Sequence, residues 1–474
     1  MTRAWRKEFK DLRNRNMIES LKHLNSAYLD NATLAAQFTD LAPALNLRQA
    51  QIESERCLYC FDAPCTRICP TEIDVASFIR NIATENINGA AKTILQQNIL
   101  GGSCARVCPT EILCEDACVR NHDAEGVPVK IGLLQRFATD HMNFDVHPFA
   151  RAALTGRTIA VVGAGPAGLA CAHQLAMLGH DVVIFEALLK PGGLNEYGIA
   201  KYKLTDNFAQ REIDFLLGIG GISIRYGQTL GDNVSLAKLK EDYSAVFLAL
   251  GLGASRALGL TGEDAPGLLA AVDYIAELRQ ADDLTQLAVP KRALVIGAGN
   301  TAIDMAVQIA RLGCEDVTVV YRRGVESMSA TKHEQEIAKA NQVRIKTWAK
   351  PQQVLLDGAG RVRGMRFENT RPVTAQLISG QTNDEFFELA ADAIFKAIGQ
   401  TLEIAQLELA ISADKICVDA NFRSNVKGVY AGGDCIAPGQ DLTVQAVQHG
   451  KLAARAIHAD LTAGENVNQS TGAA

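Results

Sequence analysis

The hydrophobic pattern divides the chain into a helical first part and a remainder in which strands and helices alternate. Between residues 74 and 98, apolar residues recur at roughly the spacing of one helix face, at Val75, Phe78, Ile79, Ile82, Ile87 and Ile94. This spacing is typical of amphipathic helices, and Asn88–Gly89 marks the expected break between two of them. We therefore expect residues 51–145 to form a helical cysteine module whose metal ligands lie on connecting loops.

The pattern changes at residue 157. Residues 157–187, "RTIAVVGAGPAGLACAHQLAMLGHDVVIFEA", are typical of a strand, a glycine turn, a helix and a second strand, and residues 292–323 repeat this order. Such alternation predicts parallel sheets covered by helices. We therefore expect an α/β fold: a helical domain over residues 1–145, a Rossmann-like domain over 146–270 and 396–474, and a second one nested within it over 271–395.

Composition and charge bear on the compartment of the protein and on the classes of partner that it can bind. The 474-residue chain has a formal net charge of −6, which argues against a general nucleic-acid binder. Its first residues lack the apolar core of a secretory signal, and no stretch approaches the ~20 uncharged apolar residues of a membrane span. The sequence thus predicts a cytoplasmic protein without nucleic-acid or membrane partners.

Eight of the twelve cysteines lie between Cys57 and Cys118. Because disulfides are rare in the cytosol, such a cluster points to metal binding or redox chemistry. The spacing is C-x2-C-x4-C-x3-C-P from Cys57 to Pro70 and C-x3-C-P-x4-C-x3-C from Cys104 to Cys118. It is similar to the pattern of bacterial ferredoxins, whereas the paired knuckles of structural zinc are missing from the second half. Two four-iron clusters are the favoured interpretation, and a zinc module is the alternative.

The first glycine turn is Gly163-x-Gly165-x-x-Gly168, between an apolar strand and a helix. In dinucleotide-binding folds these glycines allow a tight turn, close approach of a pyrophosphate and close packing of helix on strand. The N-terminus of the helix then faces the phosphates. Glu186 ends the second strand, where it can accept hydrogen bonds from the 2′-hydroxyl of a ribose.

The second turn, Gly297-x-Gly299-x-x-Ala302, has Arg322 and Arg323 where the first unit has its glutamate. A guanidinium can bind a 2′-phosphate that a carboxylate would repel. The contrast favours a ribose with free hydroxyls at the first turn and NADP(H) at the second. A solvated surface pair of arginines is the alternative.

A third element, "VYAGGDCI" at residues 429–436, is an apolar strand that leads to Gly433 and Asp434. The order of the three elements resembles the glutathione-reductase-like flavoproteins, in which such an aspartate reaches FAD. The redox disulfide of that family is missing here, because Cys171 stands alone in its helix. Electrons that leave the flavin would therefore take another route.

The cysteine blocks "CLYCFDAPCTRICPTEID" and "SCARVCPTEILCEDACVR", together with "VKIGLLQRFATD", closely resemble the N-terminal half of dihydropyrimidine dehydrogenase. The resemblance covers about residues 45–460 and extends to the separate bacterial subunit that carries this half. It implies two 4Fe-4S clusters and leaves Cys104 without a metal. The ligands of one would be Cys57, Cys60, Cys65 and Cys118, and those of the other Cys69, Cys108, Cys114 and Gln135. Spacing alone does not decide between Gln135 and Cys104.

The same resemblance implies the residues that bind the other cofactors. For FAD these are Gly163, Ala164, Gly165, Pro166, Ala167, Gly168, Glu186, Gly192, Gly193, Leu194, Lys203, Leu230, Gly433 and Asp434. For NADP(H) or NAD(H) they are Ala298, Gly299, Asn300, Thr301, Arg322, Arg323, Ala397, Ile398 and Gly399. Lys203 stands where the family has an arginine, and a further family arginine falls on Ser329, with Lys332 three residues on.

The function implied by the resemblance is that of an electron-entry subunit of a dihydropyrimidine dehydrogenase, active in pyrimidine catabolism. NAD(P)H would reduce FAD, and electrons would pass through the clusters to a separate FMN-containing subunit that reduces uracil or thymine. Because the cofactors carry this chemistry, no catalytic side chain is assigned. The chain ends at residue 474, so we expect the pyrimidine site on the partner. The rivals are the small subunit of NADPH-dependent glutamate synthase and a non-catalytic dinucleotide-binding protein with a zinc module.

Overall fold

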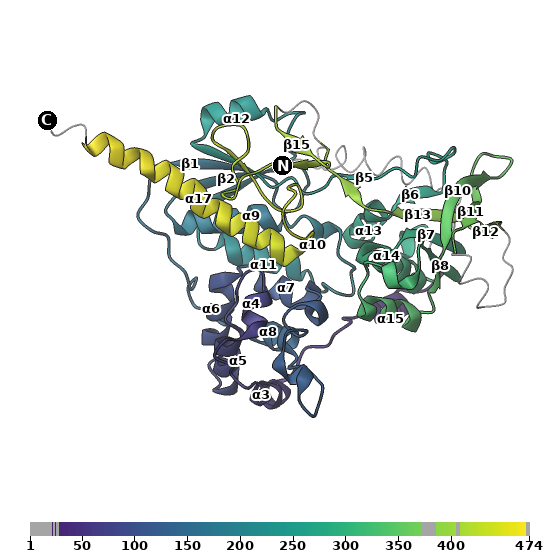
Figure 1. Cartoon of the computed structure of the whole chain (residues 1–474), viewed down its shortest axis with the longest axis horizontal. Coiled ribbons are helices and arrows are strands. Elements are labelled where there is room, and N and C mark those ends of the chain that lie inside the picture. Colours follow the sequence, from purple (N-terminus) through teal and green to yellow (C-terminus); the bar gives the residue numbers. More distant parts are fainter. Residues whose placement is uncertain (1–20, 22–23, 25–27, 372–384, 404–407, 471–474) are drawn as a thin grey trace. The chain divides into compact units, whose positions relative to one another are not determined.

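Two structural units, each assembled from separate stretches of sequence, make up the chain (Figure 1). A computed structural model describes residues 21, 24, 28–371, 385–403 and 408–470. One unit, here called the cysteine unit, comprises residues 42–196, 206–253 and 401–474. The other, here called the Arg322 unit, comprises residues 1–41, 197–205 and 254–400.

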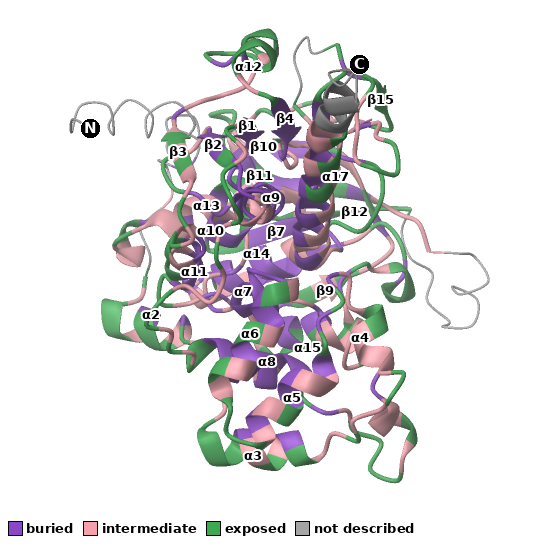
Figure 2. Ribbon diagram, turned by 90° about the vertical axis from the view of Figure 1, so that its left-hand side faces the viewer, coloured by how far each residue is buried: buried purple, intermediate pink, exposed green. Residues whose placement is uncertain are grey.

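Short helices form the first part of the cysteine unit. They are α3 (Leu47–Glu55), α4 (Pro64–Ile68), α5 (Val75–Ala83), α6 (Ile87–Gln97), α7 (Gly101–Val107) and α8 (Ile131–Asp140). Apolar side chains of α5, α6 and α8, including Phe78, Ile94 and Phe137, pack into one core, and the buried residues along α8 are purple in Figure 2. The helix break predicted at Asn88–Gly89 is wrong by a few residues. The break lies at residues 84–86, because the Asn86 side chain accepts a hydrogen bond from the Gly89 N–H and so caps α6.

A parallel sheet forms the rest of the cysteine unit. Its order is β17 (Val429–Ala431), β4 (Ala245–Leu248), β1 (Thr158–Val162), β2 (Asp181–Glu186) and β3 (Ile222–Tyr226). Helix α17 (Thr443–Ser470) packs along α9 (Pro166–Met177), as Figure 1 shows. The two helices approach each other at a glycine, since a Cβ on Gly450 would lie 2.1 Å from the carbonyl oxygen of Ala167.

The Arg322 unit has its own parallel sheet, in the order β6 (Leu268–Ala270), β13 (Ala393–Ala397), β7 (Arg292–Gly297), β8 (Asp316–Val320) and β9 (Arg344–Lys346). Its helices include α13 (Ala271–Gln280), α14 (Asn300–Arg311) and α15 (Lys332–Ala340). An antiparallel sheet of β10 (Ala349–Leu356), β11 (Val362–Asn369) and β12 (Phe386–Ala390) adjoins it. The predicted fold class, a helical module with two Rossmann-like sheets, is confirmed. None of the described helices is both long and apolar enough to cross a bilayer.

Candidate functional site

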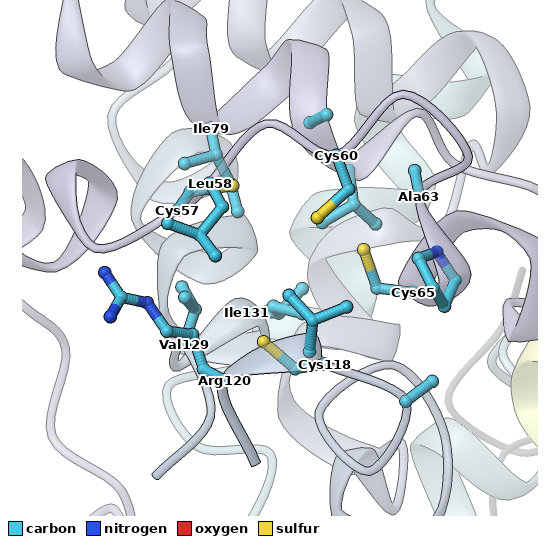
Figure 3. Close-up of a pocket in the computed structure, with 15 residues that line it drawn as sticks. Cys57, Leu58, Cys60, Ala63, Cys65, Ile79, Cys118, Arg120, Val129 and Ile131 are labelled. Atoms are coloured by element: carbon cyan, nitrogen blue, oxygen red, sulfur yellow. The ribbon is translucent and has the colours of Figure 1, made fainter. Parts of the chain in front are cut away.

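Four cysteines from separate elements line one cavity of the helical module, here called the first cavity. Cys57 and Cys60 follow α3, Cys65 lies in α4, and Cys118 directly precedes the 3-10 helix η2 (Val119–His122). The sulfur atoms of Cys60, Cys65 and Cys118 point toward one another across the cavity (Figure 3). The structure thus brings together the four residues predicted to hold one cluster.

A second cavity is lined by the remaining members of the cysteine cluster and by one glutamine: Cys69, Cys104, Cys108, Cys114 and Gln135. They come from the end of α4, from α7 and the residue after it, from the loop after the 3-10 helix η1 (Thr110–Ile112), and from α8. The prediction that the ligands lie on connecting loops is thus wrong for Cys65 and Gln135, which lie within α4 and α8. The structure therefore gathers the predicted second ligand set. It also places both candidates for the fourth ligand, Gln135 and Cys104, at the same cavity.

The orientation of the Gln135 amide suits a ligand. Its Nε2 donates a hydrogen bond to the carbonyl oxygen of Gly101 at 2.7 Å. Its Oε1 has no hydrogen bond to any residue that the structure describes, and the side chain is only 8% exposed. The Cys104 thiol instead lies beside Cys108, where its hydrogen bond and burial raise the pKa of Cys108 well above the usual range. These contacts leave the Gln135 oxygen available as an electron-pair donor.

The protonation state and the arrangement of the thiols indicate which kind of metal group they can bind. Burial raises the pKa of Cys57 and Cys114, and it raises that of Cys65 to about 11. Such thiols stay protonated at neutral pH unless a metal binds them as thiolates. Zinc requires four ligands that converge to ~2.3 Å from one point. Within the described part of the chain, no group of three or more histidine, cysteine, aspartate or glutamate side chains is arranged to hold a metal ion. Thiols spread around a cavity suit a multi-atom iron–sulfur group.

The first glycine turn has the conformation that a dinucleotide site requires. Gly163 has a φ of +100°, and a Cβ on Gly168 would lie 2.0 Å from the Gly163 carbonyl oxygen. Both positions therefore need glycine. A loop glycine lies against the turn, since a Cβ on Gly193 would lie 2.8 Å from the Cα of Gly165. Pro166 opens α9 directly after the turn, so that the helix N-terminus faces this point.

Glu186 ends β2 with its carboxylate buried beside the turn. One oxygen accepts a hydrogen bond from the Ala164 N–H at 2.7 Å and the other accepts from the Leu188 N–H at 2.7 Å. Each oxygen retains a further lone pair that could accept a ribose hydroxyl. Burial raises the pKa of Glu186. The Gly192 N–H donates to the Ala164 carbonyl oxygen at 2.7 Å, which holds the segment with the predicted FAD residues Gly192 and Gly193 against the turn.

Two more predicted FAD segments meet the same turn. A Cβ on Gly433 would lie 3.0 Å from a side chain in the first turn of α9. Asp434 follows it, and burial raises the pKa of Asp434 to about 6. Leu230 lies close by, because the N–H of Gln228, two residues before it, donates to the Glu186 carbonyl oxygen at 2.9 Å. The elements β1, β2 and β17 thus gather most of the predicted FAD residues.

Lys203 is placed differently, in the Arg322 unit. Its ammonium nitrogen lies 2.7 Å from an oxygen of Asp304 and 2.6 Å from an oxygen of Glu334. Burial alone lowers the pKa of Lys203, but the two carboxylates outweigh burial and leave that pKa raised. A phosphate would have to compete with both carboxylates, so the role of Lys203 toward FAD stays a prediction.

In the Arg322 unit, the second glycine turn lies against the end of β13, where the predicted residues Ala397, Ile398 and Gly399 stand. Gly297 has a φ of +150°, and a Cβ there would lie 2.2 Å from the Ala397 carbonyl oxygen. The turn therefore lies against residues 397–399. Asn300 begins α14, and its Oδ1 is buried without a hydrogen-bond partner among the described residues. Ser329 lies beside the turn as well, since a Cβ on Gly299 would be 3.4 Å from its hydroxyl oxygen.

Arg322 and Arg323 follow β8 with exposed side chains. Neither forms an ion pair with a residue in the described ranges. Their backbone is held in place, because the Trp348 N–H donates to the Arg323 carbonyl oxygen at 3.0 Å and the Thr370 hydroxyl donates to the Arg322 carbonyl oxygen at 2.7 Å. Lys332, the first residue of α15, is also exposed. A fixed backbone with unengaged guanidinium groups suits the binding of a phosphate.

Residues outside the cysteine motifs also belong to the second cavity, and the sequence did not reveal them. Asn98, between α6 and α7, lines it. Lys451 of α17 donates hydrogen bonds from its ammonium to the carbonyl oxygens of Gln97 at 2.9 Å and Thr71 at 3.2 Å. A single asparagine or lysine in an ordinary helical context carries no motif, so only the fold connects these residues with the cysteines.

Comparison with protein families follows the same division of the chain. A model described as pyridine nucleotide-disulphide oxidoreductase matches residues 157–450. A second, described as dihydropyrimidine dehydrogenase domain II, 4Fe-4S cluster, matches residues 34–145. The chain belongs to the pyridine nucleotide-disulphide oxidoreductase family and is an oxidoreductase.

Individual relatives confirm the resemblance seen in the cysteine blocks. The chain is 35% identical over 420 residues to the NAD-dependent dihydropyrimidine dehydrogenase subunit PreT of Salmonella typhimurium. This alignment covers 88% of this chain and 96% of the relative. PreT of Escherichia coli K12 is 34% identical with the same coverage. The glutamate synthase (NADPH) small chain of Escherichia coli K12 is 31% identical over 448 residues, with 89% of this chain and 93% of the relative covered.

Solved structures support the α/β fold over about two thirds of the chain. Mycobacterium tuberculosis FprA in complex with NADPH matches with a TM-score of 0.54 at 19% identity, over 66% of this chain and 86% of FprA. Thioredoxin reductase of T. acidophilum matches with a TM-score of 0.51 at 20% identity, over 64% of this chain and 99% of the reductase. Both matches support the pair of Rossmann-like sheets.

Proposed function

We propose that the chain is the electron-entry subunit of a dihydropyrimidine dehydrogenase, which oxidises NAD(P)H and delivers electrons to a separate FMN-containing subunit. The observation that carries this proposal is the pair of cavities in the cysteine unit. Four predicted ligands line each of them, and the same unit holds the first glycine turn. When bound, FAD takes two electrons from a nicotinamide and the two 4Fe-4S clusters carry electrons singly onward.

The residues of the chain bind and orient these groups. The turn at residues 163–168 and the N-terminus of α9 hold the FAD pyrophosphate, and Glu186 and Asp434 fix the sugar portions. The turn at residues 297–301 holds the nicotinamide nucleotide. Arg322 and Arg323 favour a 2′-phosphate at that turn.

Helix α17 supports an order for the electron path. Its second residue, Val444, lines the second cavity. Asp434, which lies beside the first glycine turn, precedes this helix by nine residues. The chain thus passes within a few residues from a predicted FAD residue to the second cavity. This short connection supports an electron path that reaches the second cavity before the first.

The test uses the complete chain, purified without oxygen. We expect FAD and about eight iron atoms per chain, as two four-iron clusters require. With NADH or NADPH the protein should reduce an artificial acceptor. Uracil reduction should require an added FMN-containing pyrimidine subunit. Bound zinc with no flavin absorbance, or uracil reduction by the chain alone, would overturn the proposal.

A second candidate is the small subunit of a glutamate synthase, favoured by the 31% identity to that chain over 448 residues. The two candidates share the cofactors and differ in the acceptor. Electron transfer to a glutamate synthase large subunit, with formation of glutamate, would support the second candidate. Electron transfer to the FMN-containing pyrimidine subunit, with none to the glutamate synthase large subunit, would exclude the second candidate.

A further inference from the structure

Asn98 presents an unpartnered amide at the second cavity. Its side chain is 0% exposed and it lines the cavity. Its Oδ1 accepts a hydrogen bond from the Leu100 N–H at 3.0 Å, which fixes the amide orientation because a backbone N–H can donate only to the oxygen. The Nδ2 group is therefore the free end of the side chain, and it has no hydrogen-bond partner among the described residues.

A buried N–H group without an acceptor is unfavourable and calls for an explanation. The chemistry of this cavity supplies one. A 4Fe-4S group held by Cys69, Cys108, Cys114 and Gln135 would bring sulfide and thiolate sulfurs, which accept hydrogen bonds. The two N–H groups of Asn98 Nδ2 would then have acceptors without any change in the position of the Asn98 carbonyl.

The first cavity offers no such group. Apart from the cysteines, its lining is apolar except for Arg120. The Arg120 Nε donates to the Arg56 carbonyl oxygen at 2.8 Å, and its Nη1 donates to Asp123 at 2.8 Å. Its Nε and Nη1 groups thus donate to atoms outside the cavity. The two cavities therefore differ in the hydrogen bonds that they can give to a bound group.

Lys451 holds the segment that carries Asn98. Its buried ammonium donates to the Gln97 carbonyl oxygen at 2.9 Å and to the Gln97 side-chain oxygen at 3.0 Å, directly before Asn98. It also donates to the Thr71 carbonyl oxygen at 3.2 Å. The Thr71 hydroxyl lies 3.4 Å from the sulfur of Cys69. The ammonium of Lys451 thus holds two segments that border the second cavity. The positive charge of Lys451 therefore lies close to this cavity.

We propose that Asn98 donates a hydrogen bond through Nδ2 to the iron–sulfur group of the second cavity and raises its reduction potential above that of the group in the first cavity. This inference rests on the proposed function. Reduction adds a negative charge to the group, and hydrogen bonds to its sulfurs stabilise that charge. Lys451 acts as a positioning residue, because it orders the segment from which Asn98 projects.

The test is a redox titration of the loaded protein followed by electron paramagnetic resonance. Asn98→Asp keeps the acceptor for the Leu100 N–H and removes the donor. We expect the equilibrium constant for one-electron reduction of the second-cavity group to fall at least tenfold, or ~59 mV, with a much smaller change for the first-cavity group. Asn88→Asp, at an exposed position of α6, is the matched control and should leave both potentials unchanged. A Gln135→Cys variant assigns the second-cavity signal.

A measurement on the wild-type sequence makes the test independent of whether the variant folds. With asparagine labelled by nitrogen-15, the reduced second-cavity group should show a weak hyperfine coupling to that nitrogen. Two clusters without this coupling and with unchanged potentials in Asn98→Asp would overturn the inference and leave the proposed function standing. One cluster per chain, or zinc, would overturn both.

Discussion

Gln135 and Cys104 line the same cavity, and the orientation of one amide distinguishes them. The cysteines could be found from the sequence because their spacing is unusual. A glutamine within an amphipathic helix is ordinary, so Gln135 came only from the resemblance to a family. Asn98 was missed altogether, because its role depends on which of its two amide ends is already hydrogen-bonded, and only coordinates show that.

The competing ligands can be separated by two substitutions. Gln135→Ala should lose the second-cavity group and leave about half of the iron, because three thiolates complete only part of a four-ligand set. Cys104→Ala should retain the full iron content. Iron and sulfide analysis of both variants, with the electron paramagnetic resonance spectrum of each, checks this. Iron loss in Cys104→Ala with full retention in Gln135→Ala would show that the thiol is the ligand.

Arg322 should decide between the two nicotinamide nucleotides. Arg322→Glu replaces a donor to the 2′-phosphate by a repelling charge. Loss of a hydrogen bond to a charged group costs about 1.5–3 kcal/mol, so we expect kcat/KM for NADPH to fall at least tenfold relative to that for NADH. Steady-state rates with an artificial acceptor give the ratio. Lys339→Glu, an exposed change of the same charge in α15, controls for net charge. An unchanged ratio would contradict the assignment.

At the scale of elements, the sequence predicted the strand–turn–helix units well, because buried parallel strands and glycine turns leave strong local signals. The position of the break between α5 and α6 was less accurate. Asn86 supplies the cap, whereas Gly89 lies inside α6 and provides the capped N–H. A glycine near a helix start therefore looked like a break although the helix begins before it.

The crossing of α9 and α17 is an element-level contact that can be tested. In Gly450→Ala, the new Cβ would lie 2.1 Å from the Ala167 carbonyl oxygen, so the helices must move apart. We expect the free energy of unfolding to fall by about 1–3 kcal/mol and FAD to bind more weakly, because α9 carries the first glycine turn. Denaturant unfolding and FAD titration measure both effects. Gly358→Ala, where a Cβ meets nothing within 4 Å, should be neutral.

Glu212 joins α11 (Phe208–Leu217) to the start of α7. Its carboxylate accepts hydrogen bonds from the Gly102 N–H at 2.7 Å, from the Ser103 N–H at 3.0 Å and from the Ser103 hydroxyl. Burial raises the pKa of Glu212 from 4.5 to about 7. Between these two values the unfolded chain has already lost this proton while the folded chain keeps it, so the contribution of Glu212 to stability falls as pH rises.

Glu212→Gln removes this titration. The melting temperature of the wild type minus that of Glu212→Gln should therefore decrease from about pH 5 to about pH 8. Thermal unfolding of both proteins across this range tests the expectation. A difference between the two proteins that stays constant over this pH range would argue against a raised pKa of Glu212.

At the scale of the whole chain, the order of the predicted cofactor sites could be read from the sequence, but the connections between distant segments could not. Lys451 bonds to Thr71, 380 positions earlier, and Val444 reaches the second cavity from the C-terminal helix. Neither residue stands in a motif. Such contacts result from the way the sheet brings α17 against the helical module, and no local pattern encodes that.

The proposed path predicts a separation of activities. Cys60→Ala should remove the first-cavity group, since one thiolate ligand is lost, and leave the second cavity and the first glycine turn intact. NAD(P)H-driven reduction of a dye that accepts electrons from the flavin should persist. Transfer to the FMN-containing subunit should fall at least tenfold. Cys417→Ala, outside the cysteine cluster, should affect neither rate. A Cys60→Ala protein with normal transfer would mean that the path bypasses the first cavity.

Helix α4 has only five residues, with Cys65 facing the first cavity and Cys69 at its end on the second. A helix of this length is unstable by itself, so its order depends on what its two cysteines bind. Binding of either metal group would order this helix and thereby position the cysteine that binds the other metal group. Filling of one site should therefore speed filling of the other. During reconstitution of the unsubstituted chain we expect few intermediates with only one group, whereas a variant that lacks a ligand of one cavity can still fill the other, more slowly.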